Sequence, residues 1–350
     1  MEILQSQLHA LFPALAFLIF GVPFALLLDR LGFFRACADI ILHRNPSYGK
    51  LWILAALTTA ILNLDTTIVL LTPLYMHIAK KAKVDPLPVV VIPLLLACFA
   101  SSLLPVSNLT NLIAASAFDI GTGDFVRYLG LPTLTAVIVG WIVYRRRFPH
   151  ELPVVPLDAE PDWRALRIGG VIVAGVLTGF LGGHLVGLEA WMVVLLADLV
   201  LLAIVRWVPW RCLPLKTALI VIVVGCAAAW LVPDGLLDGV LRSDADLPGI
   251  VGAIGLSTLL ANAINNLPTV LIGVQSADAP GWGLWAWLLG VNIGAALLPI
   301  GALANVLWKG IVTQHGLPLS WRQYLSVSLP IGLPTLAAAG LVLVAEFWLF

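Results

Sequence analysis

The chain has 350 residues, of which 61% are hydrophobic and 11% are charged, and its mean hydropathy is +1.02. Soluble domains carry roughly 25% charged residues, so this composition excludes a soluble globular protein and predicts a multi-pass protein of the inner (plasma) membrane. With 19 basic and 19 acidic residues the net charge is zero, which gives nucleic acid no field to bind.

Long apolar runs predict the full membrane spans. Each such run approaches the roughly 20 residues that cross a bilayer as a helix. We expect full spans at about 10–28, 126–144, 166–187, 190–206, 216–232 and 325–347.

The region 51–118 contains breaks and does not fit a simple series of spans. Lys50 stands before the apolar segment 51–79, and Lys80, Lys81 and Lys83 follow it. A single crossing would place one basic cluster outside, against the positive-inside rule. We therefore predict a re-entrant hairpin over 51–79, with arms at 51–62 and 67–79, each too short to cross alone, and its tip at Asn63-Leu64-Asp65-Thr66.

The segment that follows this hairpin, 86–118, is expected to cross once as a broken helix. The break is placed at Pro105-Val106-Ser107-Asn108, because Pro105 removes a backbone donor and leaves carbonyl groups that need other partners. Together with the span before the hairpin and the span after the break, these elements form a first repeat over 1–144. A polar, proline-containing stretch at 145–165 is predicted to be a cytoplasmic linker.

A second repeat over 166–350 has the same plan in the opposite orientation. Its hairpin is expected at 250–279, entering from outside with its tip near Asn265, Asn266 and Pro268, and its broken helix at 284–313, interrupted at Pro299 and Gly301. With this assignment only Arg127 and Arg242 of the 19 basic residues lie outside.

The two regions share a short motif. Asn63-Leu64-Asp65-Thr66 returns as Asn266-Leu267-Pro268-Thr269, and each copy is followed by a block of proline and asparagine within apolar sequence. Duplicated broken helices are typical of secondary transporters with inverted repeats. The predicted fold class is therefore an all-α polytopic membrane protein with inverted repeats, each with a re-entrant hairpin and a broken helix: about eight full spans plus two hairpins.

The motif blocks resemble those of a known family. The run from Asn63 to Pro73, the run Val106–Asn111, the run Asn265–Leu271 and the run Leu298–Trp308 are similar to the arsenical pump membrane proteins of the ion transporter superfamily. That superfamily also holds citrate, divalent anion and Na+/H+ exchange families. The first motif departs from the arsenite pump pattern, because Asn-Leu-Asp-Thr stands where Asn-Asp-Gly is expected.

This resemblance implies that the hairpin tips and the helix breaks converge on one polar binding site. The expected substrate- or ion-binding residues are Asn63, Asp65, Thr66, Thr67, Ser107, Asn108, Thr110 and Asn111 from the first repeat, and Asn262, Asn265, Asn266, Thr269 and Asn305 from the second. The helix breaks are expected at Pro105, Pro268, Pro299 and Gly301. Amides and hydroxyls suit a neutral triol such as arsenous acid, or a small cation, better than a bare polyanion.

Asp65 is the single acid in these blocks, and an ionisable residue at membrane depth is a functional candidate by default. We predict that it couples transport to protons. A structural role, as a helix cap or in a salt bridge, is the alternative. Each asparagine, serine or threonine taken alone has the alternative of holding helices together. Asp198, in the span 190–206, serves either packing or a proton route.

The cysteines and tryptophans give weaker evidence about function. Cys37, Cys98, Cys212 and Cys226 have no paired spacing, so no metal site and no thiol-ligated cargo site is expected. Tryptophans near span ends, among them Trp52 and Trp308, are interpreted as interfacial anchors.

The predicted function is proton-coupled efflux of arsenite or antimonite by a secondary active transporter. The alternative is a Na+/H+ antiporter or an organic-anion carrier, for citrate or a dicarboxylate, of the same superfamily. An intramembrane enzyme would need a base and a phosphate-binding arginine near the polar blocks, and a scaffold protein has no use for duplicated breaks. No cofactor is expected. The partners are a small inorganic solute or ion, protons or Na+, and the lipid bilayer, while a homodimer and a cytosolic ATPase are left open.

Overall fold

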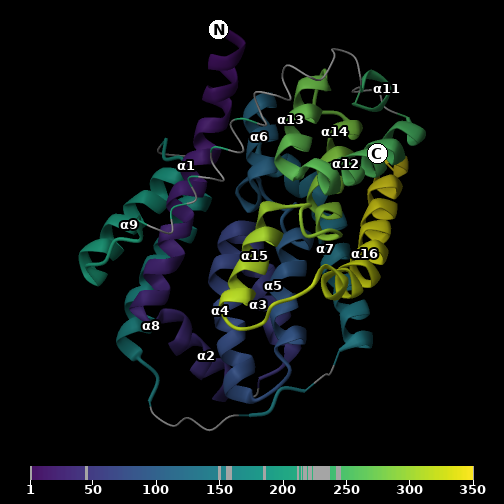
Figure 1. Ribbon diagram of the computed structural model, residues 1–350. Coiled ribbons are helices and arrows are strands. Elements are labelled where there is room, and N and C mark those ends of the chain that lie inside the picture. Colours follow the sequence, from purple (N-terminus) through teal and green to yellow (C-terminus); the bar gives the residue numbers. More distant parts are fainter. Residues whose placement is uncertain are drawn as a thin grey trace.

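Helices make up the described chain, and no β-strand occurs in it beyond one antiparallel bridge between Ser47 and Glu151. The computed structural model describes residues 2–43, 46–148, 151–154, 160–183, 187–210, 237–241 and 246–349, with single positions between 213 and 223 (Figure 1). Apart from Leu219 and Val223, the predicted span 216–232 lies outside these residues, as does the middle of the predicted linker 145–165.

The first half contains α1 (Glu2–Leu31), α2 (Phe33–His43), α3 (Tyr48–Ile61), α4 (Leu64–Ala82), α5 (Pro86–Phe99), the 3-10 turn η1 (Pro105–Ser107), α6 (Leu109–Phe118) and α7 (Thr122–Arg147). The second half contains α8 (Trp163–Gly182), α9 (Ala190–Val205), α11 (Asp238–Leu241), α12 (Leu247–Ile264), α13 (Asn266–Ser276), α14 (Trp282–Asn292), the 3-10 turn η4 (Gly294–Ala296), α15 (Leu303–Gln314) and α16 (Trp321–Leu349).

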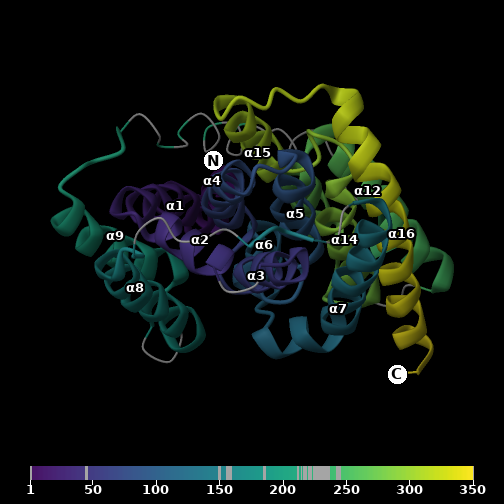
Figure 2. The same ribbon diagram turned by 90° about the horizontal axis from the view of Figure 1, so that it is seen from below.

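These helices form three groups in space. One side holds α1, α8 and α9, and the opposite side holds α7 and α16, which pack along each other (Figure 1). The view from below shows α3, α4, α5 and α15 between these two sides (Figure 2). The middle group contains the predicted binding residues at 63–67 and Asn305, and the remaining ones lie on or beside η1, α6, α12 and α13.

The first helix pair, α3 and α4, meets at Leu62 and Asn63. The sequence places the tip at 63–66, but α4 begins at Leu64 and continues for 19 residues, longer than the arm predicted at 67–79. The reason is a cap. Asn63 takes a φ of 153° and its side chain accepts a hydrogen bond from the Thr66 backbone N–H, so the helix begins directly after it.

The second pair, α12 and α13, meets at Asn265, whose φ is 82° and whose side chain accepts from the Leu267 backbone N–H. Pro268, which the sequence predicts as a helix break, lies in the first turn of α13. Proline fits there, because the first backbone N–H groups of a helix have no partner within the helix. The predicted break at Pro268 is therefore wrong.

Two further helix pairs are interrupted by short non-helical segments. η1, which starts at Pro105, stands between α5 and α6, and η4 with Pro299 and Gly301 stands between α14 and α15. A Cβ atom at Gly301 would lie 2.2 Å from the carbonyl oxygen of Ala295 and 2.7 Å from Asn262 Oδ1. The second interruption therefore depends on a glycine, because the backbones approach too closely for a side chain.

Three described helices are long and apolar enough to cross a membrane: α7, α12 and α16. The part of α1 from Leu15 onward and the helix α2, bent by 63° at their junction, form a fourth candidate. α12 belongs to this group by length, although the sequence predicts it as one arm of a hairpin.

Two tryptophans interpreted as interfacial anchors are instead buried. Trp308 is 1% exposed and its Nε1 donates to the carbonyl of Val90, while Trp52 is 2% exposed and donates to the carbonyl of Val137. Each indole fastens two helices together because a buried N–H group needs an acceptor.

Gly301→Ala should destabilise the protein, by about 1–3 kcal/mol, because its new methyl group would overlap a backbone carbonyl. Gly310→Ala is the matched control: a Cβ there meets nothing within 4 Å, and alanine favours the helix. Thermal unfolding of both purified variants in the same detergent measures the difference. Equal midpoints would show that the break tolerates a side chain.

Candidate functional site

Asn111 hydrogen-bonds the backbone of the first interruption, between α5 and α6. Its Nδ2 donates to the carbonyl oxygens of Ser101, at 2.8 Å, and Leu104, at 2.9 Å. Both carbonyls lie between α5 and α6, and of the two only that of Leu104 also accepts a backbone hydrogen bond in the described residues, from the Ser107 N–H of η1. One amide from the following helix therefore stabilises the open backbone, as a non-helical segment within apolar surroundings requires.

Asn305 does the same for the second interruption. Its Nδ2 donates to the carbonyl oxygens of Ala295, at 2.9 Å, and Leu298, at 3.0 Å. Asn262 adds to this closure, with Nδ2 donating to the carbonyl of Gly294 and Oδ1 accepting from the Leu298 backbone N–H. Asn111, Asn262 and Asn305, all predicted as binding residues, thus use these donors for structure.

Asn292, at the end of α14, was missed by sequence reasoning and connects the two halves. Its Oδ1 accepts from Asn108 Nδ2 at 2.8 Å and from Thr110 Oγ1 at 2.6 Å. Its Nδ2 donates to Asn111 Oδ1 at 2.7 Å and to Ser102 Oγ at 3.2 Å. All four side-chain hydrogen bonds of this buried amide go to the first half. Its signal in the sequence was a lone amide within an apolar run.

Cys98 holds the corresponding place in the first half. It is the last residue but one of α5, as Asn292 is the last of α14, and its Sγ lies 3.8 Å from Asn305 Oδ1, within donating distance. Each interruption is therefore hydrogen-bonded to the other half, in a crossed arrangement: Asn292 of the second half donates to Asn111, and Cys98 of the first half donates to Asn305. The first crossing has strong amide bonds and the second has one weak thiol bond.

The start of α4 supplies hydrogen-bonding groups next to the first interruption. Thr67 Oγ1 donates to the Asn63 carbonyl at 2.8 Å and accepts from Thr59 Oγ1 at 3.1 Å. Ser107 Oγ donates to the carbonyl of Ala60 at 2.5 Å. These bonds hold the end of α3 and the start of α4 against η1.

The start of α13 repeats this geometry. Thr269 Oγ1 donates to the Asn265 carbonyl at 2.8 Å, as Thr67 does to Asn63. Asn265 Nδ2 donates to the carbonyl of Ile300 at 2.9 Å. The structural counterpart of Asn63 is therefore Asn265, one residue before the one that the shared motif suggests.

This shift changes the counterpart of Asp65. The motif aligns Asp65 with Pro268, whereas the capping geometry aligns it with Leu267. The acid has no polar counterpart in either alignment, so the two starts differ in charge although their backbones match.

Two buried oxygens in these first turns have no hydrogen-bond partner among the residues that the structure describes: Asp65 Oδ1 and Asn266 Oδ1. Asp65 is 8% exposed and Asn266 is 2% exposed. α1 approaches here, because a Cβ at Gly21 would lie 3.4 Å from Thr66 Oγ1. Buried polar atoms are almost always paired, so two unpaired oxygens at equivalent helix starts mark a place where a ligand, proton or water completes the bonding.

No lysine or arginine occurs in the segments 63–67, 105–111, 262–269 or 299–305, which the structure describes in full. The positive ends of helix dipoles are the local source of positive potential. α4, α6 and α13 begin with asparagine caps at Asn63, Asn108 and Asn265, whereas α15 begins after Ala302 with no side-chain cap.

The helices of the two halves also cross. α4 packs on α15, and α13 packs on α6, so each capped helix of one half lies against the helix that follows the interruption in the other half. The capped starts, the interruptions and the crossing amides thus belong to one buried polar centre.

Asn292→Ala should destabilise the protein far more than Cys98→Ala, although the two positions correspond. The first change removes the partner of Thr110 Oγ1 and of Asn111 Oδ1 and one of two acceptors of Asn108 Nδ2, and should cost about 3 kcal/mol or more. The second removes one weak bond and should cost about 1 kcal/mol. Cys98→Ser, which keeps a donor, should resemble the parent protein. Thermal unfolding of the three variants compares them, and equal losses at both positions would contradict the crossed arrangement.

Several proteins similar to this chain are arsenical pump membrane proteins. The arsenical pump membrane protein of Yersinia enterocolitica is 28% identical over 371 residues, covering 94% of this chain and 86% of that protein. The protein of the same name from Escherichia coli K12 is 27% identical with the same coverage. The putative arsenical pump membrane protein of Bacillus subtilis is 23% identical, covering 88% of this chain and 81% of its own. The resemblance stated from the motifs is confirmed, as is a multi-pass protein of the inner membrane.

A solved structure shares the fold. The YdaH transporter of Alcanivorax borkumensis, described as having an unusual topology, matches with a TM-score of 0.52 over 97% of this chain and 86% of its own, at 16% identity. The described helices and this similarity confirm an all-α membrane transporter fold. Residues 2–290 match the profile of the citrate transporter family, CitMHS. The chain therefore belongs to the citrate transporter family of secondary membrane transporters.

Proposed function

We propose that this protein is a proton-coupled efflux transporter for arsenite and antimonite. The observation that carries the proposal is the unpaired Asp65 Oδ1, buried at the start of α4 beside amides and hydroxyls. Similarity to arsenical pump membrane proteins over 94% of the chain supports the substrate class.

The arrangement that we propose is a pair of inverted repeats. α3 with α4, and α12 with α13, act as hairpins that enter the bilayer from opposite sides, and α5 with α6, and α14 with α15, act as broken spans. Support comes from the matched caps at Asn63 and Asn265 and from the matched amides of Asn111 and Asn305.

Asp65 is proposed as the coupling residue. Near the middle of a membrane an unpaired carboxylate costs about 3 kcal/mol or more, so the group is neutralised by a proton, a cation or the helix start on which it stands. Its structural counterpart is apolar Leu267, and such asymmetry suits a group that titrates better than one that shapes the substrate. Asn63, not Asp65, caps α4, so the carboxylate is not needed as a cap.

The substrate proposal follows from the remaining polar groups. Arsenous acid is a neutral triol, with hydroxyls that both donate and accept. Asn266 Oδ1 and Asp65 Oδ1 are acceptors to which no described residue donates, so they are available to substrate hydroxyls. A neutral solute also requires no lysine or arginine, and the polar segments contain none.

A second candidate function is organic-anion transport, which the citrate transporter family match favours. One observation supports it: α15 begins without a side-chain cap, so its first backbone N–H groups and its dipole can receive a carboxylate. A side-by-side transport assay with arsenite, antimonite, Na+ and citrate in everted membrane vesicles decides between the candidates. Saturable citrate uptake without arsenite uptake would favour the anion carrier.

Asp65→Asn should abolish uptake driven by a pH gradient into everted vesicles while substrate still binds. Asparagine keeps the size of the side chain and cannot titrate, so coupling is lost while the surrounding amides remain. Uptake of arsenite under an imposed gradient measures coupling, and substrate protection against thermal unfolding measures binding.

Asp119→Asn serves as the matched control for this experiment. Asp119 is an exposed acid of the same repeat that takes a left-handed conformation after α6, a conformation that asparagine tolerates well. It should transport like the parent. Full gradient-driven transport by Asp65→Asn would refute the coupling role.

The proposed orientation predicts which loops face the cytoplasm. Single cysteines at Lys83, Arg146 and Thr313 should react with a membrane-impermeant thiol reagent only from the cytoplasmic side, and those at Thr122 and Ala279 only from the periplasmic side, because Lys and Arg concentrate in cytoplasmic loops. A Cys98→Ser background keeps the buried donor during labelling. Periplasmic labelling at Lys83 would show that α3 and α4 cross together, which removes the first hairpin.

A further inference from the structure

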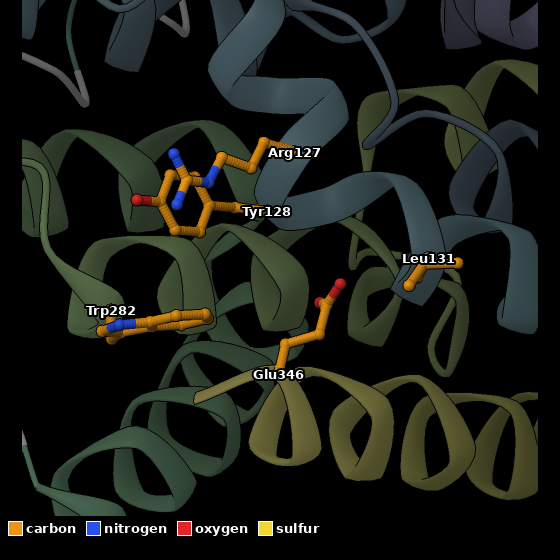
Figure 3. A pocket seen from close by; sticks show the side chains of 5 residues that line it. All are labelled: Arg127, Tyr128, Leu131, Trp282 and Glu346. Carbon is orange, nitrogen blue, oxygen red and sulfur yellow. The ribbon is translucent and has the colours of Figure 1, made fainter. Parts of the chain in front are cut away.

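A cavity of ≈ 210 Å³ lies away from the polar centre, among the ends of three helices. Arg127, Tyr128 and Leu131 line it from α7, Trp282 from α14 and Glu346 from α16 (Figure 3). It is smaller than the roughly 300–1,000 Å³ of pockets for drug-sized ligands, so it admits a group of a few heavy atoms.

Glu346 is the unusual member of this cavity. It is 7% exposed, and within the described part of the chain its Oε2 has no hydrogen-bond partner. Figure 3 shows the carboxylate pointing from α16 into the space between Trp282 and Leu131. A buried carboxylate without a partner costs free energy, so a bound cation or hydrogen-bond donor would stabilise it.

The aromatic walls favour an organic cation. Tyr128 and Trp282 meet edge to face, with ring centroids 5.1 Å apart, and Phe347 lies 5.7 Å from Trp282. Tyr128 already stacks on Trp285, with ring centroids 4.9 Å apart, and carries Arg127 over its ring. The Trp282 ring beside the carboxylate can attract an ammonium group, and the carboxylate accepts its hydrogen bonds. A primary ammonium, with three donors, therefore fits Glu346 better than a quaternary one.

Arg127 supplies the opposite charge at the mouth of the cavity. Its side chain is exposed, its guanidinium lies 5.4 Å from the centroid of the Tyr128 ring, and it forms no ion pair with any residue that the structure describes. Guanidinium groups bind phosphate with two parallel hydrogen bonds. An anionic site at Glu346 and a cationic site at Arg127 together match a ligand that carries both an ammonium and a phosphate.

The position of the cavity indicates where such a ligand comes from. α7 and α14 begin here and α16 ends here, so the cavity lies at the ends of membrane helices, where tryptophan and tyrosine meet the lipid headgroups. Leu131 and Val126 of α7 are 56% and 48% exposed, as expected of side chains that face lipid chains. The cavity thus opens beside an apolar surface at headgroup depth.

We propose that this cavity binds the headgroup of a zwitterionic phospholipid with a primary amine, of the phosphoethanolamine type. The ammonium binds Glu346 beside the Trp282 ring, the phosphate binds Arg127, and the acyl chains lie along α7. The site is independent of the proposed transport centre. It stabilises the pairing of α7 with α16, which pack along each other.

Native mass spectrometry of the full-length protein tests this assignment. The detergent-solubilised protein is titrated with phosphatidylethanolamine, phosphatidylcholine or phosphatidylglycerol of identical acyl chains. One molecule of phosphatidylethanolamine should bind more tightly than the other two lipids. Glu346→Gln should weaken that binding by about tenfold, the effect of losing one charge-assisted hydrogen bond, and Arg127→Gln should weaken the binding of all three lipids by a similar factor, because each carries the phosphate.

Two matched controls accompany these variants. Arg322→Gln changes an exposed arginine at the opposite end of α16, and Glu160→Gln changes an exposed acid before α8, so both should bind lipid like the parent. Equal affinity for the three lipids, or unchanged binding by both Glu346→Gln and Arg127→Gln, would overturn the proposal. A competition arm uses soluble phosphoethanolamine: failure to displace the lipid at millimolar concentration supports a lipid site, and displacement at micromolar concentration would overturn it in favour of a soluble ligand.

Discussion

The fold depends on one constraint: a backbone that leaves the helix inside apolar surroundings must find hydrogen-bond partners within the protein. Both interruptions meet it in the same way, with one asparagine amide donating to two carbonyls. The asparagine oxygen is then free to accept from the other half, and this acceptance ties the interruptions together. The polar centre therefore serves first to satisfy backbone groups that the helices leave unpaired. Only its polar atoms that are not used in this way can bind a substrate.

Because most of these polar groups bond within the protein, only a few residues remain to bind a substrate. Most of the asparagines and hydroxyls that the sequence marks as a site bond to the backbone or to one another. The two oxygens that remain unpaired belong to Asp65 and Asn266, at the starts of α4 and α13. When most hydrogen-bond donors of a site are bonded within the protein, the site keeps its shape without a ligand. This preorganisation lowers the free-energy cost of ordering the site when a solute binds.

The sequence predicts the location of the interruptions well, because proline, glycine and asparagine seldom gather within an apolar run unless the helix is interrupted there. It locates helix starts less well. Asn63 and Asn265 cap the helices that follow them, so residues expected in the hairpin tips belong to helices. Proline is acceptable in a first turn, so the predicted break at Pro268 is wrong. Asn292 could not be recognised, since a single amide in an apolar helix forms no motif and its partners are set by packing between halves. Burial of Trp308 is hidden for the same reason.

The partners of Asn292 also bear on how the protein is made. Asn108 precedes it by 184 residues and Thr110 precedes it by 182, so the first half leaves the ribosome long before the residue that completes its hydrogen bonds exists. Until then those side chains can bond only to water, to the insertion machinery or to one another. The first half is consequently an incomplete folding unit, and its polar interior becomes dry only when α14 is inserted beside it.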